Sequence, residues 1–373
     1  MLRLVWVAAV FSILAVPANA GDCEAPCVGA TLSIELMDEL VFAADPGFLK
    51  MNSLQPEAEV ESFLAVSEVF RLVARHTLSQ VIDPEPGESS TFSGLGLVTS
   101  ELYGELTLNP LTLRAGKFAP VFSRVNEVAD VLKASDLAGN ADMDESLGFG
   151  LALDLGGARL EHRLVATAFT MDRSFFAGSL FSERPIPELS DGGIGNTSGL
   201  SSFSLVLDGC AGDTPEDCYE DGRFGYRLGA RYQRVGVATR WDEWAGLAAA
   251  HVNFEIDEER ALRLIGEAGV VHHFEGGPAD ALIATAIAAL VDGPITYSAA
   301  LSRQWTVDPG SQDTAQSLAE LSLKYAPEDS GPFPQSSWSL QAGYVLAVDE
   351  DDHIDHMLGT TIAFELGVSH SFD

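Results

Sequence analysis

The sequence predicts an all-β protein, a transmembrane antiparallel β-barrel of sixteen strands. Three observations support this fold class. Apolar and small polar residues alternate over many segments, these segments recur along the whole chain, and the connections between them differ in length in a regular way. Alternation places the two kinds of side chain on opposite faces of a sheet. In a membrane barrel the apolar face contacts lipid and the polar face lines a wet interior.

The final segment of the chain shows the alternation most clearly. From Ile362 to Val368 the even positions are apolar and the odd positions are small or polar, and Phe372 ends the pattern. A tilted membrane strand needs roughly 9–11 residues, which this segment supplies. Comparable strands are expected at 31–43, 57–67, 71–82, 93–106, 111–118, 146–155, 159–170, 200–208, 224–235, 245–256, 261–273, 280–291, 294–307, 316–325, 336–348 and 358–372.

The lengths of the connections give the predicted barrel a direction. If the first strand runs outward, inner turns follow the even-numbered strands, and several are short, at 108–110, 156–158, 257–259 and 292–293. The two longest connections, 119–145 and 171–199, fall on the outer side, an asymmetry that is typical of membrane barrels. The inner connection 209–223 is long, so a slip of one hairpin in the count stays open. Whether the third outer loop, 119–145, folds into the lumen also stays open.

The N-terminal residues 1–20 have the features of a secretory signal peptide, which leaves 21–373 as a single barrel domain. A positive start precedes an apolar segment at 4–16, and small residues lead to a cleavage site after Ala20. Export permits disulfides among the four cysteines. The two short spacings favour local pairs without determining them: Cys23 with Cys27, and Cys210 with Cys218.

The chain is strongly acidic. It has 21 Lys and Arg against 55 Asp and Glu, a net charge of −34, which becomes −35 when Arg3 leaves with the signal peptide. This balance argues against nucleic acid or anionic lipid as partners bound through a basic patch. A hydrophobic content of 46% is too high for a disordered acidic protein.

Two short motifs resemble those of bacterial outer-membrane porins. The run from Gly116 to Pro120, at a strand end before a long loop, is similar to one in porins, including the phosphate-selective type. The terminal strand resembles the closing signal read by the barrel-assembly machinery, although Asp373 follows the aromatic Phe372. The resemblance implies a passive channel in the bacterial outer membrane for small hydrophilic solutes or ions. It implies outer-membrane lipids as partners and no cofactor, with a homotrimer as an open alternative.

Charged residues at the predicted lumen positions suggest how such a channel selects. Opposed charges across a constriction orient solutes and select ions, although wall charges that are only solvated or paired remain the alternative. With many carboxylates near the mouths, we expect a weak cation preference. The basic wall would comprise Arg71, Arg75, Arg114, Arg163, Arg227, Arg231 and Arg263, and the acidic third loop would present Glu127, Asp130, Asp136, Asp142, Asp144 and Glu145. Lys117 has the parity of Leu111 and Leu113, on the lipid face, so its position stays open, with the rim as one alternative.

Other functions have less support in the sequence. The segment 349–356 is dense in carboxylates and histidines that suit Ca²⁺, Mg²⁺ or Zn²⁺, but a solvated outer loop is the preferred interpretation, and no metal site is predicted. Gly-x-Ser-x-Gly, His-Glu-x-x-His and Ser-x-x-Lys motifs are absent, so we expect no enzyme. The alternatives are a non-conducting barrel that acts as a surface scaffold or adhesin and, more remotely, a barrel hydrolase.

Overall fold

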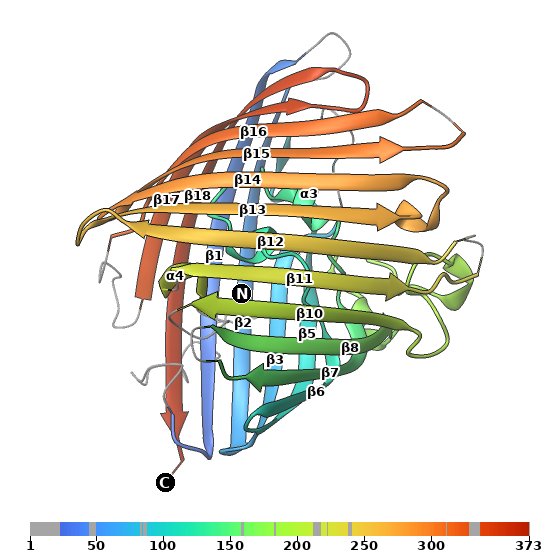
Figure 1. The fold of residues 1–373 in the computed structure, drawn as a ribbon, viewed down its shortest axis with the longest axis vertical. Coiled ribbons are helices and arrows are strands. Elements are labelled where there is room, and N and C mark those ends of the chain that lie inside the picture. Colours follow the sequence, from blue (N-terminus) through green and yellow to red (C-terminus); the bar gives the residue numbers. More distant parts are fainter. Residues whose placement is uncertain are drawn as a thin grey trace, which may run out of the picture.

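In a computed structural model of the protein, sixteen long antiparallel strands form a closed barrel (Figure 1). The structure describes residues 23–44, 50–82, 84, 88–157, 160–182, 184–211, 218–221, 223–237, 241–310, 312–327 and 336–372, so the expected signal peptide lies outside the described residues. The long strands are β1 (Cys27–Ala44), β2 (Met51–Ser67), β3 (Phe70–Gln80), β5 (Leu95–Leu108), β6 (Leu111–Phe118), β7 (Ser146–Leu155), β8 (Glu161–Met171), β10 (Ser202–Ala211), β11 (Phe224–Gln233), β12 (Glu243–Glu255), β13 (Arg260–His272), β14 (Asp280–Asp292), β15 (Ile295–Val307), β16 (Thr314–Tyr325), β17 (Ser336–Val348) and β18 (Ile354–Ser371).

The first and last strands close the barrel. β1 pairs with β2 on one side and with β18 on the other, in a register that runs from Cys27 opposite Ser371 to Ala44 opposite Asp355. Two additional strands of two residues each, β4 (Ser90–Thr91) and β9 (Leu180–Phe181), add to β2 and β5 near the outer end. Each of the sixteen expected segments overlaps one long strand, and no hairpin is lost near 209–223. The sixteen-stranded barrel is therefore confirmed.

The outer surface of the barrel is an apolar belt bounded by aromatic residues. Phe149, Leu301 and Leu321 point outward and are 61%, 65% and 64% exposed. Aromatic pairs occur near both ends of the strands, Tyr232 with Trp244 at the outer end and Tyr325 with Trp338 at the inner end. Such a belt with girdles at both interfaces is the signature of a barrel that spans a lipid bilayer. No helix in the described part of the chain is long and apolar enough to cross a membrane.

The third outer loop, residues 119–145 (loop 3), leaves the wall after β6 and turns into the barrel with two short helices, α2 (Val125–Val128) and α3 (Asp136–Gly139). Figure 1 shows α3 behind the front strands, inside the barrel. Gly116 precedes the turn with φ of 140°, and a Cβ atom there would lie 2.3 Å from the Leu102 carbonyl oxygen. Only glycine fits this conformation and this space. The remaining short elements are η1 (Phe175–Ala177), η2 (Leu189–Asp191), α4 (Cys218–Asp221) and η3 (Phe274–Gly276).

Candidate pore constriction

Two carboxylates on the barrel wall hold loop 3 inside the lumen. Glu267 on β13 accepts hydrogen bonds from Ser123 Oγ at 2.8 Å and from the backbone N–H groups of Arg124 and Val125 at 2.6 and 3.1 Å. These N–H groups stand at the start of α2, where the first turn of a helix leaves its donors without partners. The carboxylate therefore satisfies three donors at once, and its negative charge strengthens each bond.

Glu320 on β16 holds the next part of loop 3 in the same manner. Its two oxygens accept from the backbone N–H groups of Leu132, Lys133 and Ala134 at 2.7, 2.8 and 3.1 Å. The side chain is only 2% exposed, so water does not compete for these bonds. Lys133 also forms an ion pair with Glu39 on β1, at 2.7 Å. Loop 3 is thus fixed to β13, β16 and β1, and two strands lie between each anchor strand and the next.

The lumen face beneath loop 3 is apolar. Phe122, Leu137 and Met143 of the loop pack against a cluster that includes Leu247 and Ile283 on the wall. A second cluster joins Val125, Ala134 and Ala138 to Ile265 and Ile287. Burial of these side chains adds to the polar anchors, since each buried apolar side chain contributes on the order of 1.5–3 kcal/mol. On β13 and β14 the lumen face thus carries large apolar side chains beside Glu267, and these pack against loop 3.

A cavity of about 210 Å³ remains between loop 3 and the walls of β6, β7, β8, β10 and β11. A second cavity of about 640 Å³ adjoins it toward the inner turns, and the two share Thr112, Arg114 and Arg163 in their linings. Both linings contain many charged residues. Together they contain five arginines, Arg71, Arg114, Arg124, Arg163 and Arg227, and six carboxylates, Glu24, Glu68, Glu105, Glu127, Asp154 and Asp208. The lining of these two cavities is thus of mixed charge.

The arginines of this region are paired with carboxylates on neighbouring strands or on loop 3. Arg227 contacts Asp208 at 2.7 Å and Glu127 at 2.9 Å, which joins the wall to the loop. Its guanidinium also donates to the Ser123 carbonyl at 2.9 Å. Arg71 and Arg114 share Glu105, at 2.7 and 2.6 Å. Bonds between ionised groups fix side-chain geometry, so these arginines form a rigid wall.

The remaining predicted arginines have different surroundings. Arg75 pairs with Glu61 and, at 3.3 Å, with Glu59. Arg163 lies 3.7 Å from Asp154 beside the cavity. Two others contact aromatic rings inside the barrel and do not line the cavities. Arg231 pairs with Glu243 at 2.6 Å over the Phe122 ring, and Arg263 lies over the Tyr219 ring.

The acids of loop 3 do not form one acidic face. Glu127 alone among the six predicted acids lines the described cavities. Three of the others pair with cations: Asp130 with Lys324 at 2.6 Å, Asp136 with Lys133 at 3.5 Å, and Glu145 with Arg184 at 3.9 Å. Asp142 accepts a hydrogen bond from the backbone N–H of Ser123, and Asp144 is exposed. Asp136 lies inside the barrel near Glu39. Burial raises the pKa of Asp136; the nearby Lys133 opposes this rise, and the negative charge of Glu39 adds to it.

Lys117 is buried, not at the rim. Its ammonium group forms an ion pair with Asp172 at 3.0 Å and donates to the Phe176 carbonyl, also at 3.0 Å. Both charged side chains are almost inaccessible, at 3% and 4% exposure. The residues that cover Lys117 belong to the outer loop 172–201 (loop 4), so this lysine joins the wall to loop 4 and brings no charge to the lumen.

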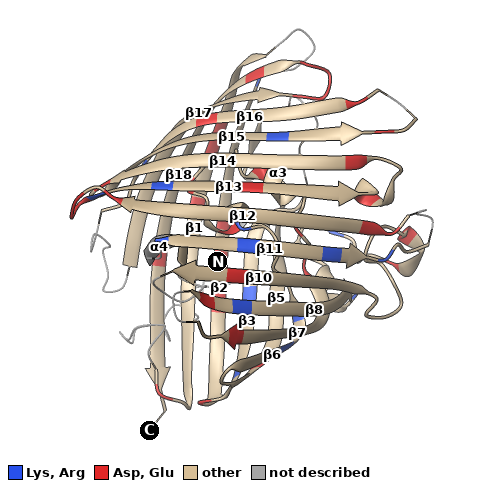
Figure 2. Ribbon diagram, in the orientation of Figure 1, with Lys and Arg blue, Asp and Glu red and all other residues tan. Residues whose placement is uncertain are grey.

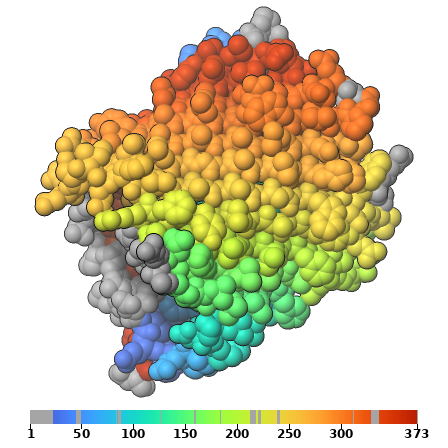
Figure 3. Space-filling model, viewed as in Figure 1, coloured from blue at the N-terminus to red at the C-terminus, as the bar shows by residue number. Residues whose placement is uncertain are grey.

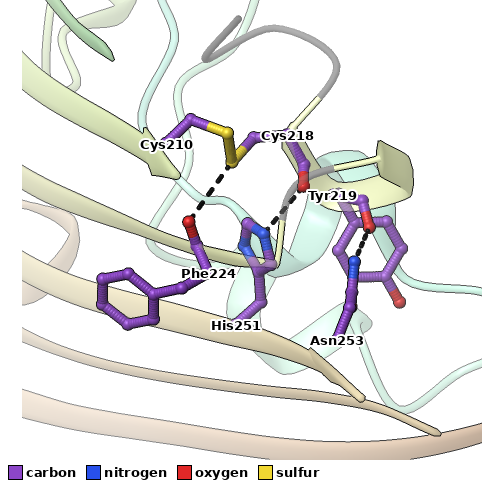
Figure 4. The surroundings of a disulfide bond; sticks show 6 residues. All are labelled: Cys210, Cys218, Tyr219, Phe224, His251 and Asn253. Carbon is purple, nitrogen blue, oxygen red and sulfur yellow. Dashed lines mark hydrogen bonds between the residues drawn. A yellow bond between two sulfur atoms is a disulfide. The ribbon is translucent and has the colours of Figure 1, made fainter. Parts of the chain in front are cut away.

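Both expected disulfides are present, Cys23–Cys27 and Cys210–Cys218. The second bridge holds α4 at the inner end of the barrel (Figure 4). There His251 donates to the Cys218 carbonyl and Asn253 donates to the Tyr219 carbonyl, each at 2.9 Å. The Tyr219 ring joins the apolar cluster of Val125 and Ile265. The long inner connection thus supports loop 3 from below.

Several residues of the site were not predicted from the sequence, above all Glu267, Glu320 and Asp208. The sequence does contain a signal for the first two, because each is the single carboxylate of its strand. The described residues contain no group of three or more metal ligands. In the outer segment 349–356, Asp349 accepts from the backbone N–H of His353 and lies 3.2 Å from its ring.

The fold and its belt define a transmembrane β-barrel of the bacterial outer-membrane type. No family model and no curated protein matches the sequence. Solved structures do resemble it: OprB of Pseudomonas putida has a TM-score of 0.58 at 9% identity, over 91% of this chain and 94% of its own. The outer membrane channel DcaP of Acinetobacter baumannii has a TM-score of 0.55 at 10% identity, over 94% of this chain and 100% of its own. OccAB1 of the same species reaches 0.50 at 11% identity, over 94% and 98%. Identities this low show a shared fold.

Proposed function

We propose that the protein is an outer-membrane porin, a passive channel for small hydrophilic solutes or ions. The observation that carries this proposal is loop 3, held inside the barrel by Glu267 and Glu320 so that a charged cavity remains beside it. A loop anchored in this way narrows the lumen while the opposite wall stays polar. Selection then depends on the charges along that wall.

We further propose that this channel has a weak cation preference. Five arginines and six carboxylates line the two adjoining cavities, so their formal charges nearly cancel. The net charge of −34 for the whole chain adds an excess of carboxylates elsewhere, which attracts cations toward the mouths. Because the positive and negative charges that line the two cavities nearly cancel, the preference for cations should be weak.

The finer resemblance to phosphate-selective porins receives no added support from the site. It rests on the run from Gly116 to Pro120, whose only charged residue, Lys117, is paired with Asp172 outside the lumen. We therefore propose a general channel and build no phosphate selectivity on this run. Recognition of β18 and Phe372 by the barrel-assembly machinery, and assembly as a homotrimer, remain predictions.

Reconstitution of the purified protein in planar bilayers tests the proposed function. We expect stepwise current increases of uniform size after addition of the protein at low concentration. Protein denatured by heat before addition is the control. A folded barrel that gives no steps would contradict the channel and would support a non-conducting surface scaffold or adhesin. Folding is checked by the heat-dependent shift in electrophoretic mobility.

A further inference from the structure

One cationic side chain lies on the lipid face of the barrel. On β15 the even residues point into the lumen, since Ser302 and Gln304 are each only 3% exposed and Gln304 accepts from Asn140 of loop 3. The odd residues point outward, as the 65% exposure of Leu301 shows. Arg303 is an exposed residue of this outward set, and it is the blue segment on β15 in Figure 2.

Arg303 lies close to the outer edge of the apolar belt. Three residues separate it from Val307, the last residue of β15 at the end where the outer loops lie. Its guanidinium carbon lies 5.0 Å from the centre of the Trp305 ring on the same face. Among the residues that the structure describes, no carboxylate is placed within ion-pairing distance of this guanidinium. A lipid-facing arginine costs up to about 2–4 kcal/mol at mid-membrane and much less near the interface, where its long side chain extends to the headgroups.

A groove on the outer surface lies below Arg303, toward the middle of the membrane. It has a volume of about 680 Å³ and crosses β13 to β17, the strands drawn yellow to orange in the outside view of Figure 3. Small side chains, Ala286, Ala288, Ala299 and Ala319, form part of its lining, and Leu301 is the outward residue directly below Arg303. The residues that face Arg303 on the neighbouring strands, Ala284 and Ser317, are also small. The groove is therefore open at its outer end.

We propose that this groove binds one acyl chain of an outer-leaflet lipid whose headgroup carries phosphate, and that Arg303 binds this phosphate. The groove continues the lipid belt, so a lipid chain is its natural occupant. A guanidinium binds phosphate through two parallel hydrogen bonds, and its place over Trp305 holds it at headgroup level. The site is one arginine above an apolar groove and not a basic patch, so it is compatible with an acidic protein.

Native mass spectrometry of the folded protein in detergent tests the proposal. The probes are phosphatidylglycerol, which is anionic, and phosphatidylcholine, whose phosphate is balanced by a quaternary amine. We expect the wild type to retain one phosphatidylglycerol about tenfold more strongly than phosphatidylcholine, as a charge-assisted contact implies. Arg303→Gln should abolish this difference. Arg260→Gln, which changes an exposed arginine at the inner end of β13, is the matched control and should preserve it.

A second variant tests the groove separately from the charge. Ala299→Phe should fill the groove and weaken the retention of both lipids, while the conductance, which depends on the lumen, stays as in the wild type. Equal retention of the two lipids by the wild type, or an unchanged preference in Arg303→Gln, would overturn the proposal. The proposal would also be overturned if Arg303→Gln changed the mass of the oligomer without losing lipid. That result would mean that this face of the barrel contacts another copy of the chain.

Discussion

At the scale of single residues, the carboxylates that hold loop 3 should control the size of the pore. In the wild type, the two charged oxygens of Glu267 accept hydrogen bonds from three donors of loop 3. In Glu267→Gln, a single uncharged amide oxygen would have to replace them. Hydrogen bonds to a charged group contribute about 1.5–3 kcal/mol each, so the loop should loosen. We expect a larger single-channel conductance and more current noise, measured in planar bilayers.

Glu258→Gln is the matched control for this change, since Glu258 is an exposed residue of an inner turn. It should leave both conductance and noise unchanged. If Glu267→Gln folds normally and conducts as the wild type does, loop 3 is held by its apolar contacts alone. The double variant with Glu320→Gln would then show whether the two carboxylates compensate for each other.

Two arginines on the same strand should differ in their effect on ion selectivity. Arg227 lines the cavity and Arg231 does not, although both have the parity of the lumen. Arg227→Gln should therefore shift the reversal potential toward that of a cation-selective channel, measured across a tenfold gradient of KCl. Arg231→Gln should shift it much less. Equal shifts would show that the whole wall, and not the cavity, sets the selectivity.

At the scale of elements, β6 is short and loop 4 covers the gap that it leaves. β6 pairs with β5 only from Leu102 to Leu108, because loop 3 departs after Phe118. Above this point β9 of loop 4 pairs with Gly96 and Leu97 of β5. An edge strand with unpaired backbone groups is unfavourable, and it is more so in a membrane. Loop 4 is therefore part of the wall.

Breaking the buried pair that joins loop 4 to β6 should destabilise the barrel. Lys117→Met leaves Asp172 buried without its cation, a change that costs about 3–5 kcal/mol. We expect the temperature at which the folded band disappears in gel electrophoresis to fall. Removing both charges, in Lys117→Met with Asp172→Leu, should recover much of the loss. If Lys117→Met alone is as heat-resistant as the wild type, the ion pair adds no stability to the barrel.

The elements were predictable from the sequence to different degrees. The sixteen long strands follow from alternation in many segments and from the regular recurrence of strand-length segments, because one face of each strand must meet lipid. The place of loop 3 was not predictable, since its anchors Glu267 and Glu320 lie more than a hundred residues further along the chain. β13 and β14 carry a hint, because Ile265, Ile283 and Ile287 place large apolar side chains on their lumen face. Large apolar side chains on a lumen face indicate that something covers them. The burial of Lys117 depends on loop 4, which has no strand pattern to place it.

At the scale of the whole molecule, the excess of negative charge should act mainly through the mouths of the channel. Salt screens such charges over about 8–10 Å at physiological ionic strength and over about 3 Å at 1 M. We expect a small reversal potential of the sign for cation preference in dilute KCl, approaching zero as both solutions are made more concentrated. A strong anion preference at every concentration would show that Arg114, Arg163 and Arg227 outweigh the carboxylates.

The distance along the chain between loop 3 and its anchors has a consequence for how the barrel folds. Ser123 and Glu267 are 144 residues apart, and Leu132 and Glu320 are 188 residues apart. Contacts of such long range form late, because the chain between them must first be ordered. Loop 3 cannot take its place until β13 and β16 have joined the sheet. Narrowing of the lumen is thus among the last events of folding, and a barrel trapped before it would leak more than the finished channel.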